Sequence, residues 1–231
     1  MDIKEFLTEK GLAPELAGKY YLLAEFLLDW NEKINITAIR DEEEFMQKNV
    51  MDSLALCGNA AFSAASEIID VGTGGGFPGL PLAIAYPEKR FMLIDSVGKK
   101  LRVIEDVTAK LGLLNAKTAH GRAEDLARKP EFRDSFDLAL SRAVANMSSL
   151  SEYCLPFVRQ GGFFIAYKTE AAQAEIEEAY GAVKKLGGKM NHFVSDGIPG
   201  SGHGFVIIEK LTPTPAAYPR KAGIPAKKPL R

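Results

Sequence analysis

The spacing of hydrophobic positions changes near residue 60 of this chain. Before that point, apolar side chains recur at steps of three and four residues, which predicts amphipathic helices. The clearest run consists of Leu16, Tyr20, Leu23, Leu27 and Trp30. Pro14 stands where a first-turn proline is expected, and Asp41 with Glu44 predicts a capped helix continuing toward Leu56. Residues 1–60 are therefore expected to form a helical cap.

After residue 60, short apolar runs alternate with segments of helical spacing. The runs are Ile68–Val71, Phe91–Ile94, Ala116–Ala119, Phe136–Leu140 and Phe163–Tyr167. Such alternation is typical of βαβ units, in which helices cover a mainly parallel sheet. The pattern therefore predicts a doubly wound α/β domain.

The last two apolar runs have no helix between them. Gly188–Val194 and Gly204–Leu211 are separated by a turn sequence, Ile198-Pro-Gly-Ser-Gly. Two strands joined in this way predict an antiparallel hairpin. We therefore expect a mainly parallel seven-stranded sheet, closed by this hairpin, over residues 61–211.

Composition limits the class of protein. The 231 residues are 46% apolar and 26% charged, a balance typical of soluble globular proteins and not of disordered chains. No stretch approaches the roughly 20 apolar residues of a membrane helix, and no secretory signal is visible at the start. Cys57 and Cys154 lie far apart in apolar settings, which argues against disulfides or a CxxC metal site and favours the cytoplasm. Without a coiled-coil seam, a monomer is expected.

The net charge of −1 argues at first against a polyanionic partner, but the charge is uneven. Residues 212–231 contain five basic residues and no acidic ones, so removing them from −1 leaves −6 for residues 1–211. The same segment contains five prolines, whose spacing disfavours helix and favours extended chain. It is interpreted either as a loosely ordered, solvated tail or as a basic arm that follows a phosphate backbone.

A glycine-rich loop follows the first predicted strand. Asp70, Gly72, Gly74 and Gly76 form the pattern D-x-G-x-G-x-G, and a helix is predicted soon afterwards. Glycines allow a sharp turn and a close approach of backbone to ligand. A formal GxGxxG match exists as well, but its first glycine comes too late after the strand for a dinucleotide loop. The first pattern resembles the cofactor loop of class I S-adenosylmethionine methyltransferases.

Acidic residues follow the second and third predicted strands. Asp95 lies about 20 residues beyond the loop, where a carboxylate can accept hydrogen bonds from both ribose hydroxyls. Alternatively, it only caps the helix that follows. NAD and S-adenosylmethionine sites share an acid at this place, so it indicates an adenosine ligand without choosing between them. After the third strand, Glu124 or Asp125 is placed to contact an adenine amino group, with Ala123 beside the ring.

Arg142 follows the fourth predicted strand, at the edge where ligands of parallel sheets bind. No segment there resembles a cradle for an exocyclic amine, and Cys154 fits the apolar face of a helix rather than a nucleophile. The three histidines, His120, His192 and His203, are scattered and predict no triad or metal cluster. A ring nitrogen such as guanine N7 has a free lone pair and no proton to lose, so its methylation needs positioning rather than a general base. Arg142 suits that reaction.

Several motifs occur together and in order along the chain. They are WNEKINITAI, MDSL, IDVGTGGGFPG, LIDS, RAE, SRAVA and YPRKAGIPAKKPL. Taken together they resemble the bacterial 16S ribosomal RNA guanine-N7 methyltransferase family, also called the glucose-inhibited division protein B family. The resemblance covers nearly the whole chain. It implies a class I, Rossmann-like methyltransferase that transfers a methyl group from S-adenosylmethionine to one guanine near the decoding region, guanine 527.

The resemblance also implies cofactor contacts. Carried onto this sequence, they fall on Gly72, Phe77, Asp95, Ser96, Val97, Ala123, Glu124 and Arg142. One departure is visible, because many relatives have histidine where this chain has Asn49. No role that requires an imidazole is therefore expected at this position.

Basic residues near the predicted strand ends are the candidates for RNA binding. Arg40, Lys168, Arg220 and Lys221 are proposed to contact 16S ribosomal RNA in the small subunit, with further positive charge from Lys99, Lys100, Arg102 and Arg122. Trp30, Asn31, Asn35 and Thr37 form either part of an RNA-facing surface or a capped turn. Two other functions stay open at this point, an NAD-dependent oxidoreductase and a non-catalytic RNA binder in ribosome assembly.

Overall fold

Seven strands form one sheet in the order β3-β2-β1-β4-β5-β7-β6. The computed structural model describes residues 2–142, 144–194 and 203–231. The first five strands are parallel, whereas β7 runs antiparallel between β5 and β6. The strands are β1 Glu67–Val71, β2 Arg90–Asp95, β3 Ala116–His120, β4 Phe136–Arg142, β5 Val158–Thr169, β6 Gly188–Val194 and β7 His203–Lys210. The expected parallel sheet with a closing hairpin is therefore confirmed, while the predicted turn at 198–202 lies outside the described residues.

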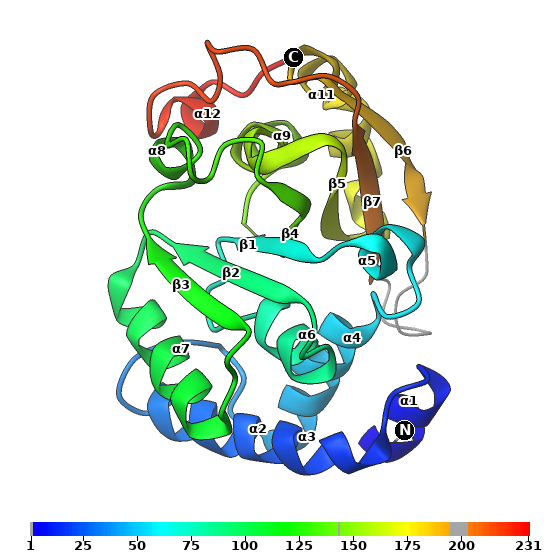
Figure 1. The fold of residues 1–231 in the computed structure, drawn as a ribbon, viewed down its shortest axis with the longest axis vertical. Helices are drawn as coiled ribbons and strands as arrows, with labels where there is room; N and C mark the ends of the chain where they lie inside the picture. The colour runs from blue at the N-terminus through cyan, green and yellow to red at the C-terminus, as the bar shows by residue number, and fades with distance from the viewer. Residues whose placement is uncertain (1, 143, 195–202) are drawn as a thin grey trace.

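Each buried strand serves two hydrophobic cores, one on either face of the sheet (Figure 1). In β1, Ile68 belongs to the core beneath α6 Gly79–Ala85 and α7 Gly98–Leu111, whereas Ile69 belongs to the opposite core. Leu138 and Ala139 in β4 alternate in the same way. Because successive side chains of a strand point to opposite faces, continuous apolar runs produce a sheet buried on both sides.

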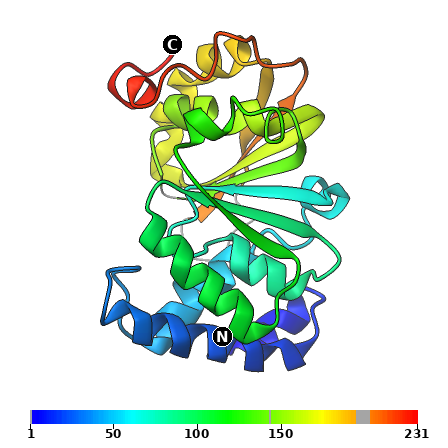
Figure 2. The same ribbon diagram turned by 60° about the vertical axis from the view of Figure 1, so that its left-hand side comes forward.

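The N-terminal helices lie outside α6 and α7, where they add a layer to one side of the molecule (Figures 1 and 2). They are α1 Ile3–Glu9, the 3-10 turn Pro14–Leu16, α2 Ala17–Asn31, α3 Glu42–Phe45, the π-helical segment Met46–Met51 and α4 Asp52–Leu54. The short helix α5 Ala60–Ala64 follows them and lies beside the sheet rather than in this layer (Figure 1). Asp41 caps α3 by accepting from the Glu44 backbone N–H at 2.9 Å, as the sequence predicts. The buried hydroxyl of Tyr20 donates to the Pro81 carbonyl at 3.1 Å and so joins α2 to α6. One hydrophobic core spans cap and sheet, so the boundary at residue 60 stays a prediction.

The opposite face of the sheet is covered by helices from the second half of the chain. These are α9 Met147–Cys154, the 3-10 turn Leu155–Phe157, the 3-10 turn Glu170–Ala172, α10 Gln173–Glu178 and α11 Tyr180–Lys185, with α8 Ala123–Leu126 at the edge. Cys154 is fully buried in the core of this face, as expected, and both cysteines are free. Among the described residues, we find no helix with the length and apolar character needed to span a bilayer.

The C-terminal segment is neither loose nor free of helix. It runs along α8 and α9 and includes α12 Ile224–Lys227 (Figure 1). The expectation that its prolines exclude helix is wrong here, because Pro225 occupies the first turn of α12, where a missing N–H breaks no helical bond. The side chain of Arg220 reaches the fully buried Glu152 of α9. This segment is therefore part of the folded domain.

Candidate cofactor site

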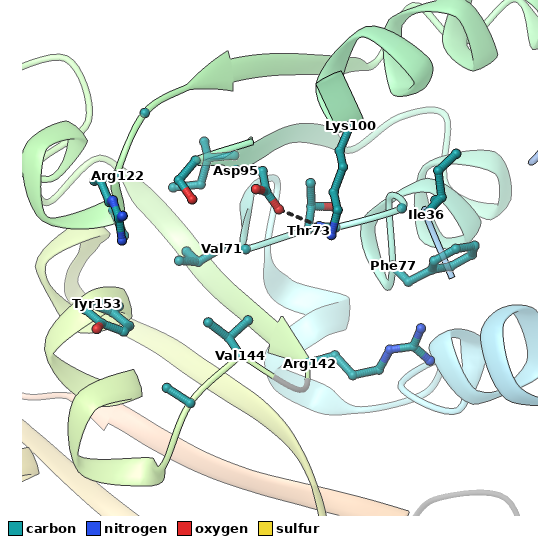
Figure 3. A pocket seen from close by; sticks show the side chains of 18 of the residues that line it. Ile36, Val71, Thr73, Phe77, Asp95, Lys100, Arg122, Arg142, Val144 and Tyr153 are labelled. Carbon is teal, nitrogen blue, oxygen red and sulfur yellow. Dashed lines mark hydrogen bonds between the residues drawn. The ribbon is translucent and has the colours of Figure 1, made fainter. Parts of the chain in front are cut away.

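The carboxyl ends of β1, β2, β3 and β4 surround a cavity of about 490 Å³ (Figure 3). In a parallel sheet these ends meet at one edge, where loops rather than strands face the solvent and ligands bind. Of the residues predicted to hold a cofactor, those lining the cavity are Gly72, Gly74, Phe77, Asp95, Ser96, Ala123, Glu124 and Arg142. The fold thus brings together residues that lie up to 70 positions apart in the chain.

The glycine loop between β1 and α6 forms the floor of this cavity. Gly72 has φ +72° and Gly74 has φ +59°, a left-handed conformation that glycine adopts without strain. A Cβ on Gly72 would also lie 2.6 Å from Cγ2 of Val144, which lines the cavity as well. The backbone turn and the closeness of the β4 loop therefore both require glycine at position 72.

Asp70 is bonded to both ends of the glycine loop but is not among the residues that line the cavity. Its Oδ2 accepts from the Thr73 hydroxyl at 2.6 Å and from the Gly79 N–H at 2.9 Å, and among the described residues its Oδ1 has no partner. Complete burial raises the pKa of this carboxyl to about 6, although both hydrogen bonds and the nearby Arg142 lower it. Asp70 is thus a positioning group for the loop.

Asp95 joins the ends of β1 and β2. Its Oδ2 accepts from the Gly74 N–H at 2.9 Å and its Oδ1 from the Val97 N–H at 2.8 Å, while the carboxylate also lines the cavity (Figure 3). The alternative that Asp95 only caps the following helix is therefore incomplete. The bond to Val97 lies at the start of α7, but the bond to Gly74 holds the glycine loop. A carboxylate offers about four lone-pair sites, so both oxygens can accept further hydrogen bonds from a ligand. Val97 is not among the lining residues and has an exposed side chain.

Glu124 lines the far end of the cavity together with Ala123, Arg122 and Tyr153. The Glu124 side chain is only 3% exposed, and its Oε1 accepts from the backbone N–H of Gly223 at 2.9 Å. Arg122 and Tyr153 lie on the side of the cavity away from Phe77 and Ile36 (Figure 3). An elongated ligand could therefore contact acidic groups at Asp95 and at Glu124.

Arg142 lies at the end of β4, where it contacts the N-terminal cap. It donates from Nη1 to the Lys48 carbonyl at 2.7 Å and to Asp52 Oδ2 at 2.8 Å, and from Nη2 to Asn49 Oδ1 at 2.8 Å. Its guanidinium carbon lies 5.4 Å from the centre of the Phe77 ring, within the range of a cation–π contact. The orientation of Arg142 is consequently set by two separate parts of the chain.

A second cavity, of about 680 Å³, lies beside the first. Asn49 and Arg142 line both cavities, and Asp52, Tyr167 and Lys168 line only the second. Asn49 is 5% exposed, and among the described residues its Nδ2 has no hydrogen-bond partner. Arg142 and Asn49 thus lie between the first cavity, which the glycine loop lines, and the second cavity, which it does not line.

The residues predicted to bind RNA come from three separate parts of the chain. Arg40 is exposed and donates to the Thr37 carbonyl at 2.7 Å, while Lys168 bonds the Ala145 carbonyl and pairs with Glu175. Arg220 forms an ion pair with the buried Glu152, whereas Lys221 is exposed. Nothing tests their contact with RNA, which stays a prediction.

Several residues at the cavity were not predicted as cofactor contacts. Ile36 and Thr37 come from a turn that Asn31 organises, since the Asn31 side chain bonds both N–H groups through Oδ1. This supports the capped-turn interpretation of Asn31. Tyr153 and Ala226 had no sequence signal, because a helix and the C-terminal segment bring them to the cavity only in the folded chain. Within the described ranges, no group of His, Cys, Asp and Glu could hold a metal ion.

Comparison with known proteins places these features in a family. The family model described as rRNA small subunit methyltransferase G matches residues 17–199. A protein of Clostridium novyi (strain NT) named "Ribosomal RNA small subunit methyltransferase G" is 45% identical over 208 residues, which cover 89% of this chain and 86% of that protein.

Two solved structures share the fold. The S-adenosylmethionine-dependent methyltransferase SibL has a TM-score of 0.56 at 17% identity, covering 75% of this chain and 57% of that one. A putative O-methyltransferase from Klebsiella pneumoniae has a TM-score of 0.54 at 15% identity, and the match covers 82% of this chain and 90% of that one. At these identities the likeness concerns the fold, and it confirms the expected class I methyltransferase architecture.

Proposed function

Because this chain belongs to the rRNA small subunit methyltransferase G family, we propose that it transfers a methyl group from S-adenosylmethionine to guanine N7 in 16S ribosomal RNA. By resemblance, the target is guanine 527. Membership makes the chain an S-adenosylmethionine-dependent methyltransferase and favours this function over the NAD-dependent oxidoreductase. The cytoplasm, where ribosomes are assembled, is the proposed location, and a monomer is the proposed state.

The residues of the first cavity fit the cofactor. The loop at Gly72 and Gly74 has no Cβ atoms that would obstruct a ligand, and Asp95 and Glu124 are two carboxylates that line the cavity. Carboxylates accept from hydroxyl and amino groups, which the ribose, adenine and amino-acid parts of S-adenosylmethionine all carry. We propose that Asp95 binds the ribose and that Glu124 lies beside the adenine.

The observation that carries the proposal is the position of Arg142 between two cavities. S-adenosylmethionine supplies an electrophilic methyl group, so the acceptor base must lie next to the first cavity, and the second cavity shares Arg142 and Asn49 with it. Arginine commonly donates to the O6 of guanine, and a hydrogen bond to O6 alone leaves the N7 lone pair free to form the bond to the methyl group. We therefore propose that Arg142 positions the guanine.

The charges around Arg142 suit this role. Asp52 balances the guanidinium at 2.8 Å, so the pair carries little net charge where the guanine ring becomes positive on methylation. N7 has no proton to lose, so no general base is needed. The contribution of this chain is then to hold the base in place and exclude water, which supplies much of the rate in positioning mechanisms.

Tritium-labelled methyl transfer tests the function. Small ribosomal subunits from a strain lacking the enzyme should accept label at one guanine, mapped by reverse transcription after cleavage at the modified base. Subunits from the parent strain carry the modification already and should accept none. Cofactor binding without transfer to either subunits or free 16S RNA would instead support the non-catalytic RNA binder.

A further inference from the structure

The C-terminal segment is held against the domain by its backbone. Arg133 donates from Nη2 to the Thr214 carbonyl at 2.7 Å and from Nη1 to the Tyr218 carbonyl at 3.0 Å. Arg128 donates to the Pro219 carbonyl at 2.5 Å. These bonds use main-chain acceptors of the segment, so none of them involves the segment's own positive charges.

Arg220 attaches this segment to α9. Its backbone N–H donates to Glu152 Oε1 at 2.7 Å, its Nε lies 3.0 and 3.1 Å from the two carboxylate oxygens, and its Nη2 donates to Oε2 at 2.7 Å. Glu152 is fully buried. A buried carboxylate with a bidentate arginine partner is a strong, directional anchor, and an uncompensated charge results if the arginine is removed. This anchor lies a few residues before the part of the segment that reaches the cofactor cavity.

Residues 223–226 contact the cavity itself. The Gly223 N–H donates to Glu124 Oε1 at 2.9 Å, and Ala226 is one of the lining residues. The Ser149 hydroxyl donates to the Pro225 carbonyl at 2.8 Å and holds α12 in place between these two contacts. Gly223 has φ +82°, a conformation that side-chain-bearing residues rarely adopt. The segment therefore orients the buried carboxylate of Glu124 through Gly223 and lines the cavity with Ala226.

We propose that residues 220–226, here called the C-terminal strap, are part of the cofactor-binding site, with Arg220, Glu152 and Gly223 as positioning residues. The strap holds Glu124 in its cavity-facing orientation and closes the cavity with Ala226, which raises the affinity for S-adenosylmethionine in the absence of RNA. The inference rests on the proposed function only through the identity of the cofactor. It differs from the interpretation of this segment as an RNA-binding arm, because charge outside the Arg220 anchor has no part in it.

The first experiment measures the dissociation constant of S-adenosylmethionine by calorimetry, with purified full-length protein and no RNA. Arg220→Met should raise it about tenfold, because Glu124 and Ala226 lose their fixed positions. The matched control is Arg159→Met. This change removes an arginine that is 61% exposed and pairs with Asp137 at the opposite end of the sheet, so it should change the constant by less than about twofold.

A second pair of variants leaves the anchor intact, in case Arg220→Met does not fold. Ala226→Leu enlarges a side chain at the cavity and should weaken binding, whereas Ala217→Leu enlarges an exposed side chain of the same segment away from the cavity and should not. Circular dichroism and the unfolding temperature without ligand show whether each variant is folded. Hydrogen exchange provides an independent readout, because bound S-adenosylmethionine should slow exchange of the amides at 223–228.

The inference is overturned if folded Arg220→Met and Ala226→Leu proteins bind S-adenosylmethionine as tightly as the unchanged protein. The same holds if the unchanged protein does not bind S-adenosylmethionine at all. If it binds the cofactor with the expected strap effects but methylates no ribosomal RNA, the strap inference stands and the proposed function fails.

Discussion

Arg142 at the end of β4 forms a 2.8 Å ion pair with Asp52 of α4, across 90 residues of sequence. Asp52 is 2% exposed and Arg142 is half-buried, so the bond joins the N-terminal cap to the reactive edge of the sheet. The bond from Arg142 Nη2 to Asn49 is a second connection between the cap and this edge.

Arg142→Lys should lower the rate of methyl transfer by about 100-fold while leaving the dissociation constant of S-adenosylmethionine within about threefold. Lysine retains the charge but cannot reproduce the fork that reaches the Lys48 carbonyl, Asp52 and Asn49 together. Single-turnover assays on small subunits and calorimetry measure the two quantities. An unchanged rate would show that Arg142 does not position the base.

Asp95→Ala should raise the dissociation constant of S-adenosylmethionine by about tenfold or more. The change removes the proposed ribose acceptor and also the bonds that fix the Gly74 and Val97 N–H groups. Asp106→Ala on the exposed side of α7 is the matched control, since it removes a carboxylate outside the cavity. Near-normal affinity in Asp95→Ala would contradict the ribose assignment.

The stability contribution of Asp70 should depend on pH in an unusual direction. Its pKa rises from an ordinary 3.8 to about 6 in the folded chain, chiefly through burial, so between these values the folded state binds more protons than the unfolded state. Stability from this group is therefore complete below pH 3.8 and is lost as the pH rises through 6. The shift corresponds to on the order of 3 kcal/mol.

Comparison with Asp70→Asn isolates this effect. The free energy of unfolding of the unchanged protein, minus that of the variant, should fall between pH 4.5 and pH 7 because asparagine does not titrate. Urea unfolding at several pH values measures both proteins. A difference that rises with pH would mean that the folded-state pKa of Asp70 is not raised.

Lys221→Ala and Arg40→Ala should each reduce the salt dependence of RNA binding. Each phosphate contact contributes about 0.7–0.9 to the slope of log K against log salt concentration. Lys19→Ala is the control, because Lys19 is exposed near the start of α2, whereas the cavity lies beyond its other end. Filter binding of 16S RNA fragments at four salt concentrations gives the slopes. Equal slopes for all proteins would show that neither Lys221 nor Arg40 contacts RNA phosphates.

Point variants test the RNA contacts more specifically than a deletion of residues 212–231. Such a deletion would remove the exposed Lys221, but it would also remove the Arg220 anchor and the Gly223 N–H that bonds Glu124. Its effect on RNA binding could then not be separated from its effect on the cofactor cavity.

Much of the fold and of the cofactor loop follows from local patterns. The alternation of apolar runs with helical spacing predicted β1 to β5, and the two apolar runs without a helix between them predicted β6 and β7. Asp41 and Glu44 predicted a helix start, and the glycines after Asp70 predicted a sharp turn, in which Gly72, Gly74 and Gly76 have positive φ. In each case the residues that determine the structure are neighbours in sequence.

Such local patterns could not predict contacts between segments that are distant in the sequence. Glu152 looks like a surface acid in its helix, yet it is fully buried against Arg220, 68 residues later. The basic, proline-rich terminus therefore resembled a solvated arm, although its backbone is bound by Arg128 and Arg133. A net charge of −1 likewise gives no information about where the charges lie.

The sequence alone determined the class I fold, the glycine loop and the acids that follow the strands, because these depend on hydrophobic period and on residues next to one another. Only the tertiary structure decided which distant partners complete the site. Arg142 meets Asp52 and Asn49, and Glu124 meets Gly223, because folding brings chain ends and strand ends to one edge of the sheet. Such pairs depend on three-dimensional packing, which leaves no periodic signal along the chain.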